Sequence, residues 1–518
     1  MDETRYPVDM QDFETLRQMG YAYVDKTPYI RRMRDTFYFL SRPRRFGKSL
    51  FLSTLDAYYS GKRELFDGLD IAKYTTTWTK HPVLKFDFSK ANQDSPEEVD
   101  QVIKEQLATY AAQYDVPYDN STLTTILFDR LVKAAFEKTG QKVVLLIDEY
   151  DAPILNVIDR PQEEIDRFRA VMNGFYSPIK GLTPYFRLVF ITGITKFSQL
   201  SIFSKLNNLS NISMLEDFEA ICGITEEELL ANFTSGITAL AEKHGLTFEG
   251  ALDRLRFKYD GYHFLDSPTR IYNPFSIINS LAKQKFDNYW FGSATPTFLL
   301  KVLRGRTLSI EQLDGKKLLS DAFDVAIEHV TDVLPILYQS GYLTIKYFQS
   351  GVYTLGFPND EVRVGMSNVI YDTILPESNN EKTALKGSLV DYLNNGDIES
   401  ALRELQSFLA SVPYDLVQNR ENYYQTILFC IFKMIGVAVD TEVRTSQGRI
   451  DIVVHTERFI YVMELKFDKS SLSALRQIKS KNYAAPYATS PKQLILVGIA
   501  FSPDTNTLKD WRISRPKK

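Results

Sequence analysis

The sequence predicts a multidomain α/β protein, with a parallel-sheet domain first, a helical middle region and a second α/β domain at the end. Strand-like apolar runs alternate with helical patterns over the first 215 residues, as is typical of parallel sheets. Helical spacing dominates the middle, and strand-like runs return after residue 440. Because a chain of 518 residues is too long for one core, we expect several domains.

Composition excludes several protein classes. The chain is 44% hydrophobic and 24% charged, which is ordinary for a globular protein, and its net charge is -4. Cys222 and Cys430 are too far apart to suggest a disulfide framework or a zinc site. No apolar run approaches the roughly 20 residues of a membrane helix, and the start, MDETRYPVDM, is too polar for a secretory signal. We therefore expect a soluble cytoplasmic protein with no membrane partner.

The N-terminal domain, placed at residues 1–215, is predicted to contain four strands. They are the apolar runs at 37–41, 82–89, 142–151 and 186–196. A helix is predicted to begin at Ser49, and residues 96–139 are predicted to be mostly helical.

A helical lid region is predicted over 216–300 and a winged-helix-like segment over 301–380. Thr225 and Glu228 have the spacing of a capping box at the start of a helix. Farther on, a helical pattern stops near Gly341, and a Ser-Gly turn at 350–351 separates two strand-like runs. A helix followed by a hairpin resembles a winged helix, which we expect to act as a spacer or switch rather than as a DNA contact.

The last domain is placed at 381–518. A helical pattern is predicted over 381–436, and a helix at 471–483. The tail RISRPKK is predicted to be frayed. Strands are predicted at 450–456, 459–467 and 494–501.

The stretch FLSRPRRFGKSLFLSTL, residues 39–55, joins a predicted strand to a predicted helix. This is the context of a phosphate-binding loop. Gly47 would allow close approach of phosphate, Lys48 would reach the β- and γ-phosphates, and Ser49 would bind Mg²⁺. The Walker A pattern requires glycine where Arg42 stands, so the GKS motif alone is equally consistent with chance. The loop residues predicted to bind the nucleotide are Arg44, Arg45, Phe46, Gly47, Lys48 and Ser49.

A second motif supports the nucleotide interpretation. The apolar run VVLLI is followed by Asp148 and Glu149, as in a Walker B strand, where the aspartate holds Mg²⁺ and the glutamate orients the attacking water. The alternative is a strand that simply ends in solvent-facing acids. The next strand ends in Thr192, Thr195 and Lys196, which are either γ-phosphate sensors or an ordinary strand terminus.

These motifs carry a family resemblance. The stretches YVDKTPYI, SRPRRFGKSLFLSTLDAYYSGKRELFDGLDI, LIDEYDAPI and ITGITKFSQLSIFSKLNNL resemble the AAA-ATPase-like proteins common in anaerobic and gut bacteria. The resemblance covers about residues 5–275. It implies that RPRRFGKS is the family's own form of Walker A and that the nucleotide is ATP. The order of domains also resembles the NTP-switch ATPases of signalling and defence, by analogy of architecture alone.

A second candidate site lies near the C-terminus, in GRIDIVVHTERFIYVMELKF. Glu464 and Lys466 are two apart on one predicted strand, so they share a face, and a hairpin would bring Asp451 beside Glu464. Two carboxylates that hold Mg²⁺ or Mn²⁺, with a lysine that steadies the attacking hydroxide, form a phosphodiesterase site. The alternative is an exposed sheet face with ordinary charge pairs.

The stretches GRID, ELK, QIKSKNYAAPY and ILVGIAFS resemble the PD-(D/E)XK nuclease superfamily domain that accompanies the AAA-ATPase-like domain. This resemblance covers about residues 385–505 and implies a restriction-endonuclease-like fold. It makes Asp451, Glu464 and Lys466 the catalytic core, with Asp451 and Glu464 as metal ligands and Gln477 in support. Glu421 would be the helix-borne acid, a role for which Glu442 competes.

The sequence supports three interpretations. The first is an ATP-gated Mg²⁺ nuclease that acts on DNA, DNA being favoured over RNA. The second is a nucleotide-switched binding module that grips nucleic acid or a partner without cleaving. The third is a defence or mobile-element component that kills the host cell.

Residues 441–518 hold fourteen Lys and Arg against seven Asp and Glu, a net charge of +7 that suits phosphate contacts. A homo-oligomer is expected if basic residues act between subunits.

Overall fold

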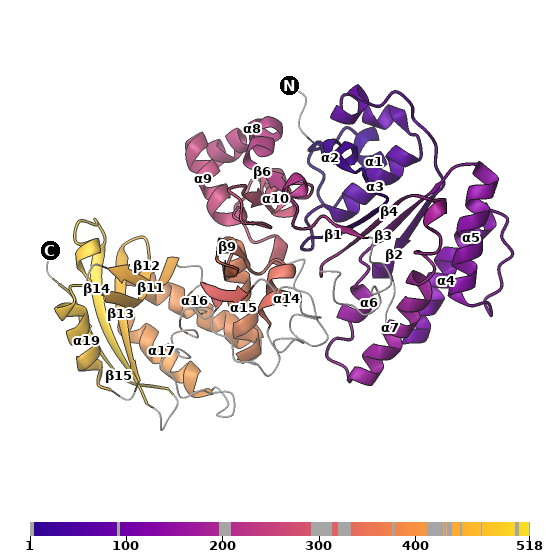
Figure 1. Cartoon of the computed structure of the whole chain (residues 1–518). Coiled ribbons are helices and arrows are strands. Elements are labelled where there is room, and N and C mark those ends of the chain that lie inside the picture. The colour runs from indigo at the N-terminus through magenta and orange to yellow at the C-terminus, as the bar shows by residue number, and fades with distance from the viewer. Residues whose placement is uncertain are drawn as a thin grey trace. The chain divides into compact units, whose positions relative to one another are not determined.

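The structure is a computed structural model that describes residues 5–90, 94–195, 209–291, 313–319, 333–374, 379–411, 428, 431–432, 438–445, 448–467, 469–502 and 507–516. The chain divides into two compact units, which are residues 1–304 with 313–362 and residues 305–312 with 363–518. Each unit has its own sheets and its own hydrophobic core (Figure 1).

A five-stranded parallel sheet forms the centre of the first unit, in the order β2-β3-β4-β1-β5. Its strands are β1 (Phe37–Ser41), β2 (Val83–Asp87), β3 (Val143–Asp148), β4 (Phe186–Gly193) and β5 (Ser210–Asn211). The four apolar runs predicted as strands are therefore confirmed. Every residue of β1 and β3 is buried, because helices cover both faces of the sheet.

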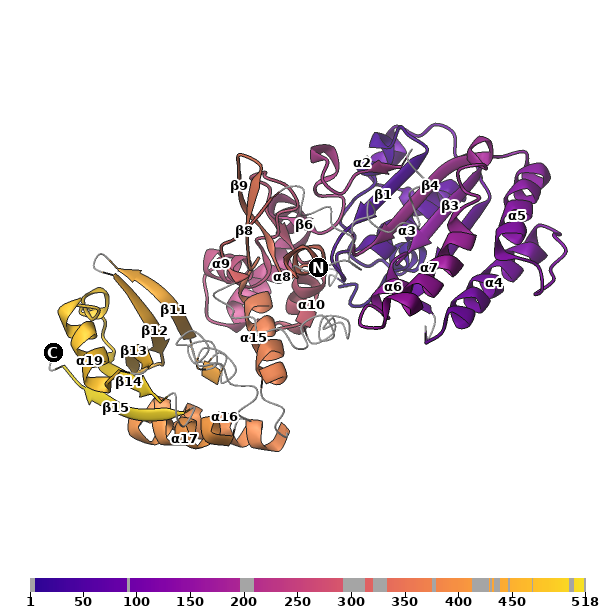
Figure 2. The ribbon, with the colours of Figure 1, turned by 60° about the horizontal axis from the view of Figure 1, so that its bottom comes forward.

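Helix α3 packs on one face of this sheet, and α4, α5 and α7 cover the other (Figures 1 and 2). Alternate residues of β3, namely Val143, Leu145 and Ile147, belong to the core on the α4–α5–α7 side. The helices of this part are α1 (Phe13–Gln18), α2 (Pro28–Arg32), α3 (Lys48–Tyr59), α4 (Pro96–Gln113), α5 (Thr124–Thr139), α6 (Ala152–Leu155) and α7 (Gln162–Tyr176).

The strand order places β4 between β1 and β3. Phe39 of β1 lies opposite Ile191, and Leu145 of β3 lies opposite Val189. In a parallel sheet the carboxyl ends of the strands meet at one edge. The end of β4 therefore lies between the loop that follows β1 and the acids that follow β3.

A helical cluster follows the sheet in the chain. It begins with the predicted capping box: the Thr225 hydroxyl accepts from the Glu228 N–H at 3.2 Å, and the Glu228 carboxylate accepts from the Thr225 N–H at 2.8 Å. These elements pack around a separate core that includes Leu229, Leu255 and Leu281. They are α8 (Glu226–Lys243), α9 (Phe248–Tyr259), α10 (Pro274–Lys283), β6 (Ile224–Thr225) and β7 (Ile271–Tyr272).

The predicted helix followed by a hairpin is confirmed. Helix α14 (Leu334–Gln339) precedes strands β9 (Thr344–Gln349) and β10 (Val352–Gly356), and β8 (Lys316–Leu319) pairs with β10 as a third antiparallel strand. Helix α15 (Asp360–Ile374) follows directly. The winged-helix assignment itself stays a prediction, since part of 301–380 lies outside the described residues.

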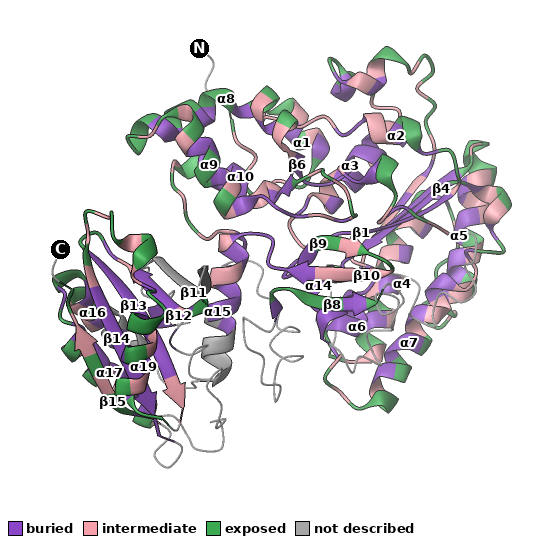
Figure 3. Ribbon diagram, turned by 60° about the vertical axis from the view of Figure 1, so that its left-hand side comes forward, coloured by how far each residue is buried: buried purple, intermediate pink, exposed green. Residues whose placement is uncertain are grey.

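The second unit is built on a five-stranded mixed sheet in the order β11-β12-β13-β14-β15. β13 and β14 run parallel and are joined through α19, whereas the other neighbours are antiparallel. β13 and β14 are buried over most of their length (Figure 3). The elements are α16 (Asn379–Asn395), α17 (Ile398–Ser411), β11 (Ala438–Thr445), β12 (Gly448–His455), β13 (Phe459–Phe467), α19 (Ser471–Ser480), β14 (Gln493–Phe501) and β15 (Leu508–Ser514).

The prediction of a frayed tail was wrong. Strand β15 contains the start of RISRPKK and pairs with β14, with Leu496 opposite Ser514. Arg515 continues the attachment by donating to the Gly396 carbonyl at 3.1 Å. The strand was missed because the exposed Lys509 and Asp510 interrupt its apolar pattern. No helix in the described part of the chain is long and apolar enough to cross a membrane.

Candidate functional site

The loop Arg42–Gly47 joins β1 to α3 at the carboxyl edge of the parallel sheet. Gly47 caps α3 with a φ of 97°, a conformation that glycine adopts without strain. Arg45 also has a positive φ, of 63°. The loop therefore turns sharply before the helix, and the amide groups at the N-terminus of α3 face the space above it, as an anion site requires.

Arg42 occupies the position of the first Walker A glycine, but its side chain extends from the loop into the protein interior. It is only 2% exposed, and its guanidinium lies 4.1 Å from the centre of the Phe264 ring. Burial lowers the pKa of this guanidinium. It donates hydrogen bonds of 2.7–3.3 Å to the carbonyls of Ser41, Ser213, Phe218 and Glu219. Arg42 therefore anchors the loop to the segment after β5 and does not line the cavity described below.

Phe46 lies away from the loop's open side. Its ring packs edge-on against Tyr262 at 4.8 Å and against Phe264 at 5.6 Å between centroids. Its carbonyl accepts from the Gly223 N–H at 3.0 Å. Both ends of the loop are thus held from outside, by Arg42 and by Phe46.

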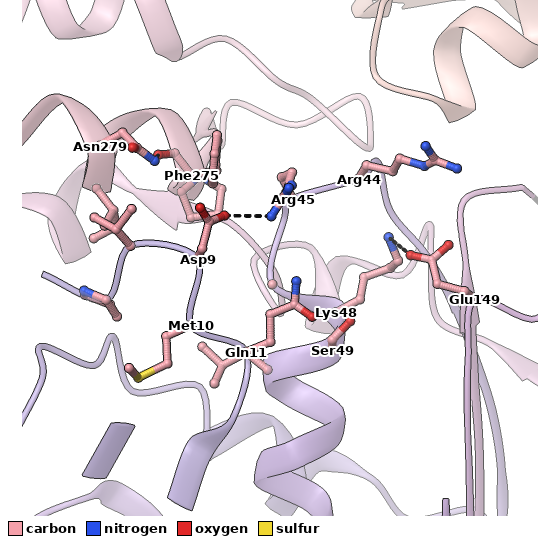
Figure 4. Close-up of a pocket in the computed structure, with 16 residues that line it drawn as sticks. Asp9, Met10, Gln11, Arg44, Arg45, Lys48, Ser49, Glu149, Phe275 and Asn279 are labelled. Carbon is pink, nitrogen blue, oxygen red and sulfur yellow. Dashed lines mark hydrogen bonds and ion pairs between the residues drawn. The ribbon is translucent and has the colours of Figure 1, made fainter. Parts of the chain in front are cut away.

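Lys48 lies inside the loop. Its ammonium donates to the carbonyls of Arg42 and Pro43, both at 3.1 Å, and lies 3.6 Å from the Glu149 carboxylate. The two residues predicted to reach phosphate and to orient water are therefore neighbours (Figure 4).

Asp148 ends β3 and faces Ser49. Burial raises the pKa of Asp148 to about 6, with the Glu149 charge adding to the effect, while a hydrogen bond from Ser49 and the charge of Lys48 oppose it. The Glu149 N–H also donates to Asp148 at 3.0 Å. A hydroxyl and a buried carboxylate that face one another fit a hard divalent cation such as Mg²⁺.

Asp151 is a functional candidate that sequence reasoning missed. Its buried carboxylate accepts from the N–H groups of Ile194 at 3.1 Å and Thr195 at 2.7 Å, just after β4. Burial raises its pKa to about 6. Gly193 has no room for a Cβ, which would lie 2.5 Å from the Asp151 carboxylate. The signal was the last acid of DEYD, because a buried acid beside an apolar strand requires hydrogen-bond donors.

Thr195, one of the predicted sensor residues, is therefore held beside the acids. Its hydroxyl lies 3.1 Å from the Tyr150 hydroxyl. Lys196, the third predicted sensor, lies outside the described residues.

A cavity of about 330 Å³ opens above the loop (Figure 4). Arg45 crosses one side of it, 2.8 Å from Asp9 and with its guanidinium 4.8 Å from the Phe275 ring centre. Arg44 extends away from this pair (Figure 4). The lining residues are Pro7, Val8, Asp9, Met10, Gln11, Arg44, Arg45, Gly47, Lys48, Ser49, Leu50, Glu149, Pro274, Phe275, Ile278 and Asn279.

A smaller and mainly apolar cavity of about 90 Å³ adjoins the first. The two share Gly47, Leu50 and Ile278, and the smaller one adds Tyr23 and Val24. The contributions of the N-terminal segment and of α10 were not predicted, because only the folded chain brings these segments to the loop.

The second predicted site is assembled on the β12–β13 hairpin. Ile452 pairs with Met463, and the Leu465 N–H donates to the Asp451 carboxylate at 2.7 Å. Asp451 therefore lies beside the strand that carries Glu464 and Lys466.

Glu464 is the centre of this cluster and is only 1% exposed. Lys466 donates to its Oε1 at 2.9 Å, and the Gln477 amide of α19 donates to the same oxygen. The structure thus brings together Asp451, Glu464, Lys466 and Gln477. A buried carboxylate with a lysine and an amide around it is a costly arrangement, typical of functional sites.

Neither candidate for the helix-borne acid lies on a helix in the described part of the chain. Glu421 lies outside the described residues. The backbone of Glu442 lies on β11 between Thr441, opposite Ile452, and Val443, opposite Ile450. Position 442 is therefore next to position 451 in the sheet. No group of three or more potential His, Cys, Asp or Glu metal ligands occurs among the residues that the structure describes.

Comparison with known proteins finds one family match around each candidate site. The family described as "Predicted AAA-ATPase" matches residues 7–203, and the "PD-(D/E)XK nuclease superfamily" matches residues 419–511. A protein from Azotobacter chroococcum mcd 1, named "Uncharacterized protein in vnfD 5'region", is 33% identical over 526 residues that cover 98% of each chain. The chain belongs to the family that joins an AAA-ATPase-like domain to a PD-(D/E)XK nuclease superfamily domain.

The family resemblance predicted from the motifs is thereby confirmed. The AAA-ATPase-like match contains the loop and the acids of the first site, and the PD-(D/E)XK match contains the hairpin and Gln477 of the second.

Proposed function

We propose that the protein binds and hydrolyses ATP and thereby gates a Mg²⁺-dependent nuclease that acts on DNA phosphodiesters. The observation that carries the proposal is the gathering of Asp451, Glu464, Lys466 and Gln477 around one buried carboxylate.

The ATP site is the 330 Å³ cavity above the loop, whose volume lies in the usual range for ligand pockets. Gly47 and the first turn of α3 would receive the phosphates, and Lys48 would exchange its two loop carbonyls for phosphate oxygens. Ser49 and Asp148 would hold Mg²⁺, which supplies charge neutralisation when bound. Glu149 would orient the attacking water.

The adjoining apolar cavity is suited to binding a purine base. Its walls include Tyr23, Val24 and Ile278, which would contact the flat faces of a base. Arg45 would exchange Asp9 for a phosphate oxygen, and Arg44, which also lines the cavity, would extend to the nucleotide. The choice of adenine rests on the family.

In the nuclease site, Asp451 and Glu464 are the residues that would hold the metal, which activates a water when bound. Lys466, already 2.9 Å from Glu464, would stabilise the attacking hydroxide and the negative charge that develops on the phosphoryl oxygens. Gln477 would orient the Glu464 carboxylate. Glu421 is proposed as the additional acid.

Basic residues on the helix that carries Gln477 favour a nucleic acid as the substrate. Arg476, Lys479 and Lys481 are exposed on or next to α19. Such a basic surface next to a phosphodiesterase site would hold the phosphate backbone.

The test is cleavage of plasmid DNA with Mg²⁺ or Mn²⁺, with and without ATP. We expect the wild type to cut, Lys466→Ala to lose at least a hundredfold in rate, on the order expected for removing electrostatic stabilisation, and Lys48→Ala to lose the response to ATP. Lys509→Ala and Lys73→Ala, at exposed positions, are the matched controls and should behave as wild type.

If the wild type leaves DNA and RNA intact under every nucleotide condition, the nuclease proposal is wrong. A DNA affinity that changes with ATP under those conditions would establish the nucleotide-switched binding module instead.

A further inference from the structure

The outer half of the phosphate-binding loop is held by Trp290, far away in the sequence. The indole N–H of Trp290 donates to the Arg44 carbonyl at 3.0 Å. The ring is 1% exposed and packs against Tyr342 at 5.2 Å between centroids. Gly341, with a φ of 87°, lies so close that a Cβ there would come within 2.6 Å of Pro43. The loop is thus held by Trp290 and Gly341 in addition to the carbonyl partners of Arg42.

Glu361 holds the same tryptophan by its main chain. Its buried carboxylate accepts from the N–H groups of Trp290, at 2.8 Å, and Tyr289. It also accepts from the Ser276 hydroxyl at 2.6 Å, in the first turn of α10. Since Pro274, Phe275 and Ile278 of α10 line the cavities, one carboxylate organises two walls of the nucleotide site.

Glu361 itself lies in the first turn of α15. Asn359 caps this helix, accepting from the Val362 N–H at 3.1 Å and donating to the Asp260 carbonyl at 2.9 Å. The division between the two compact units falls inside α15, after Val362. A continuous chain of hydrogen bonds therefore runs from the loop carbonyl of Arg44 through Trp290 to the helix that continues into the second unit.

We propose that Trp290 and Glu361 are positioning residues of the nucleotide site, which tie the phosphate-binding loop and the start of α10 to the first turn of α15. Nucleotide on the loop then stabilises the start of α15, and a loosened α15 weakens nucleotide binding, because coupling between two sites is reciprocal. This inference rests on the proposed ATP site.

Tryptophan emission provides a direct readout. The chain has three tryptophans, so Trp78→Phe/Trp511→Phe leaves Trp290 as the single emitter. We expect a saturable change in its emission on addition of ATP and Mg²⁺, with the same midpoint as ATP binding measured by equilibrium dialysis.

Substitutions separate positioning from a general packing role. Trp290→Phe keeps an aromatic ring but removes the donor to Arg44, and should weaken ATP binding about fivefold, the effect of one lost neutral hydrogen bond. Trp78→Phe is the matched control, because Trp78 packs against Tyr58 and Phe66 away from the loop, and should bind as wild type. Glu361→Gln retains a carbonyl acceptor for Trp290 and should rescue the binding that Glu361→Ala loses.

Hydrogen exchange of the full chain tests the link to α15. Saturating ATP should slow exchange of amides 360–366 in the wild type, and less so in Trp290→Phe. If the wild type binds ATP while Trp290 emission is unchanged and Trp290→Phe binds with wild-type affinity, the positioning role is wrong and the ATP site stands. If the wild type binds no ATP, the proposed function and this inference are both overturned.

Discussion

At the scale of single residues, three buried ionisable side chains hold the segments that surround the proposed nucleotide site. Arg42, Asp151 and Glu361 are each at most 2% exposed, and each holds main-chain groups of another segment. Arg42 donates to carbonyls, whereas the two carboxylates accept from N–H groups. Hydrogen bonds to charged groups are stronger than neutral ones. The geometry of the site thus depends on charges outside the predicted set of ligand contacts.

Glu361 makes stability depend on pH. Burial raises its pKa from 4.5 to about 7, although Ser276 and Lys258 oppose the shift. The folded protein therefore binds this proton more tightly than the unfolded chain does. The contribution to the free energy of unfolding is complete below about pH 4.5 and is lost as the pH rises through 7, by about 3 kcal/mol in total.

We expect Glu361→Gln to lack this loss, because a neutral amide has no ionisation to suppress. The measurement is urea unfolding of wild type and variant between pH 5 and pH 8. Glu64→Gln, at an exposed position, is the control and should follow the wild type. Parallel profiles for wild type and Glu361→Gln would show that Glu361 does not titrate in this range.

At the scale of elements, β15 protects the edge of the second sheet. It pairs with β14, and Gln406 of α17 donates to the Leu508 carbonyl at 2.7 Å. Removal of this strand would expose the hydrogen-bonding groups of β14, which are a template for aggregation.

Truncation after residue 507 should therefore lower the thermal stability of the second unit and speed its proteolysis. Truncation after Arg515 keeps β15 and the bond to Gly396, and should leave both unchanged. The two truncations can be compared by circular dichroism melting and limited trypsin digestion. Equal behaviour would mean that β15 contributes nothing measurable.

Strands with a clear apolar run or alternation could be predicted from the sequence, including β2 at the sheet edge, whereas an edge strand without such a pattern could not. The runs at 37–41 and 143–148 are apolar throughout because helices cover both sides of their sheet. Strand β15 was missed because Lys509 and Asp510 are exposed and interrupt the apolar pattern.

The residues of the candidate sites also differ in whether the sequence could predict them. Asp148, Glu149 and the Asp451 cluster follow strand ends or a hairpin, so local spacing was enough to place them. Asp9 and Phe275 join the cavity from segments separated by more than 200 residues, and no local pattern reports such an approach.

At the scale of the whole molecule, the two compact units suggest two separable unfolding events. A ligand that binds only the folded first unit stabilises that unit by about 2.7 kcal/mol at a concentration of one hundred times Kd. The second unit gains stability only through coupling.

Calorimetry with and without ATP and Mg²⁺ should therefore show two transitions, of which ATP raises the one that belongs to the first unit. Lys48→Ala should abolish the shift. A single transition that ATP leaves in place would contradict both the separation of the units and the nucleotide site.

The anchoring of Arg42 limits how the loop could be transferred to another protein. In this chain the conformation of the β1–α3 loop depends partly on residues 213–219 and on Phe264, which contact the Arg42 side chain. A graft of residues 37–49 into another scaffold would keep the Ser41 carbonyl but would lose the other three acceptors of the buried guanidinium, which lie in residues 213–219. The loop can therefore keep its conformation in another protein only if the segment that accepts these hydrogen bonds is transferred with it.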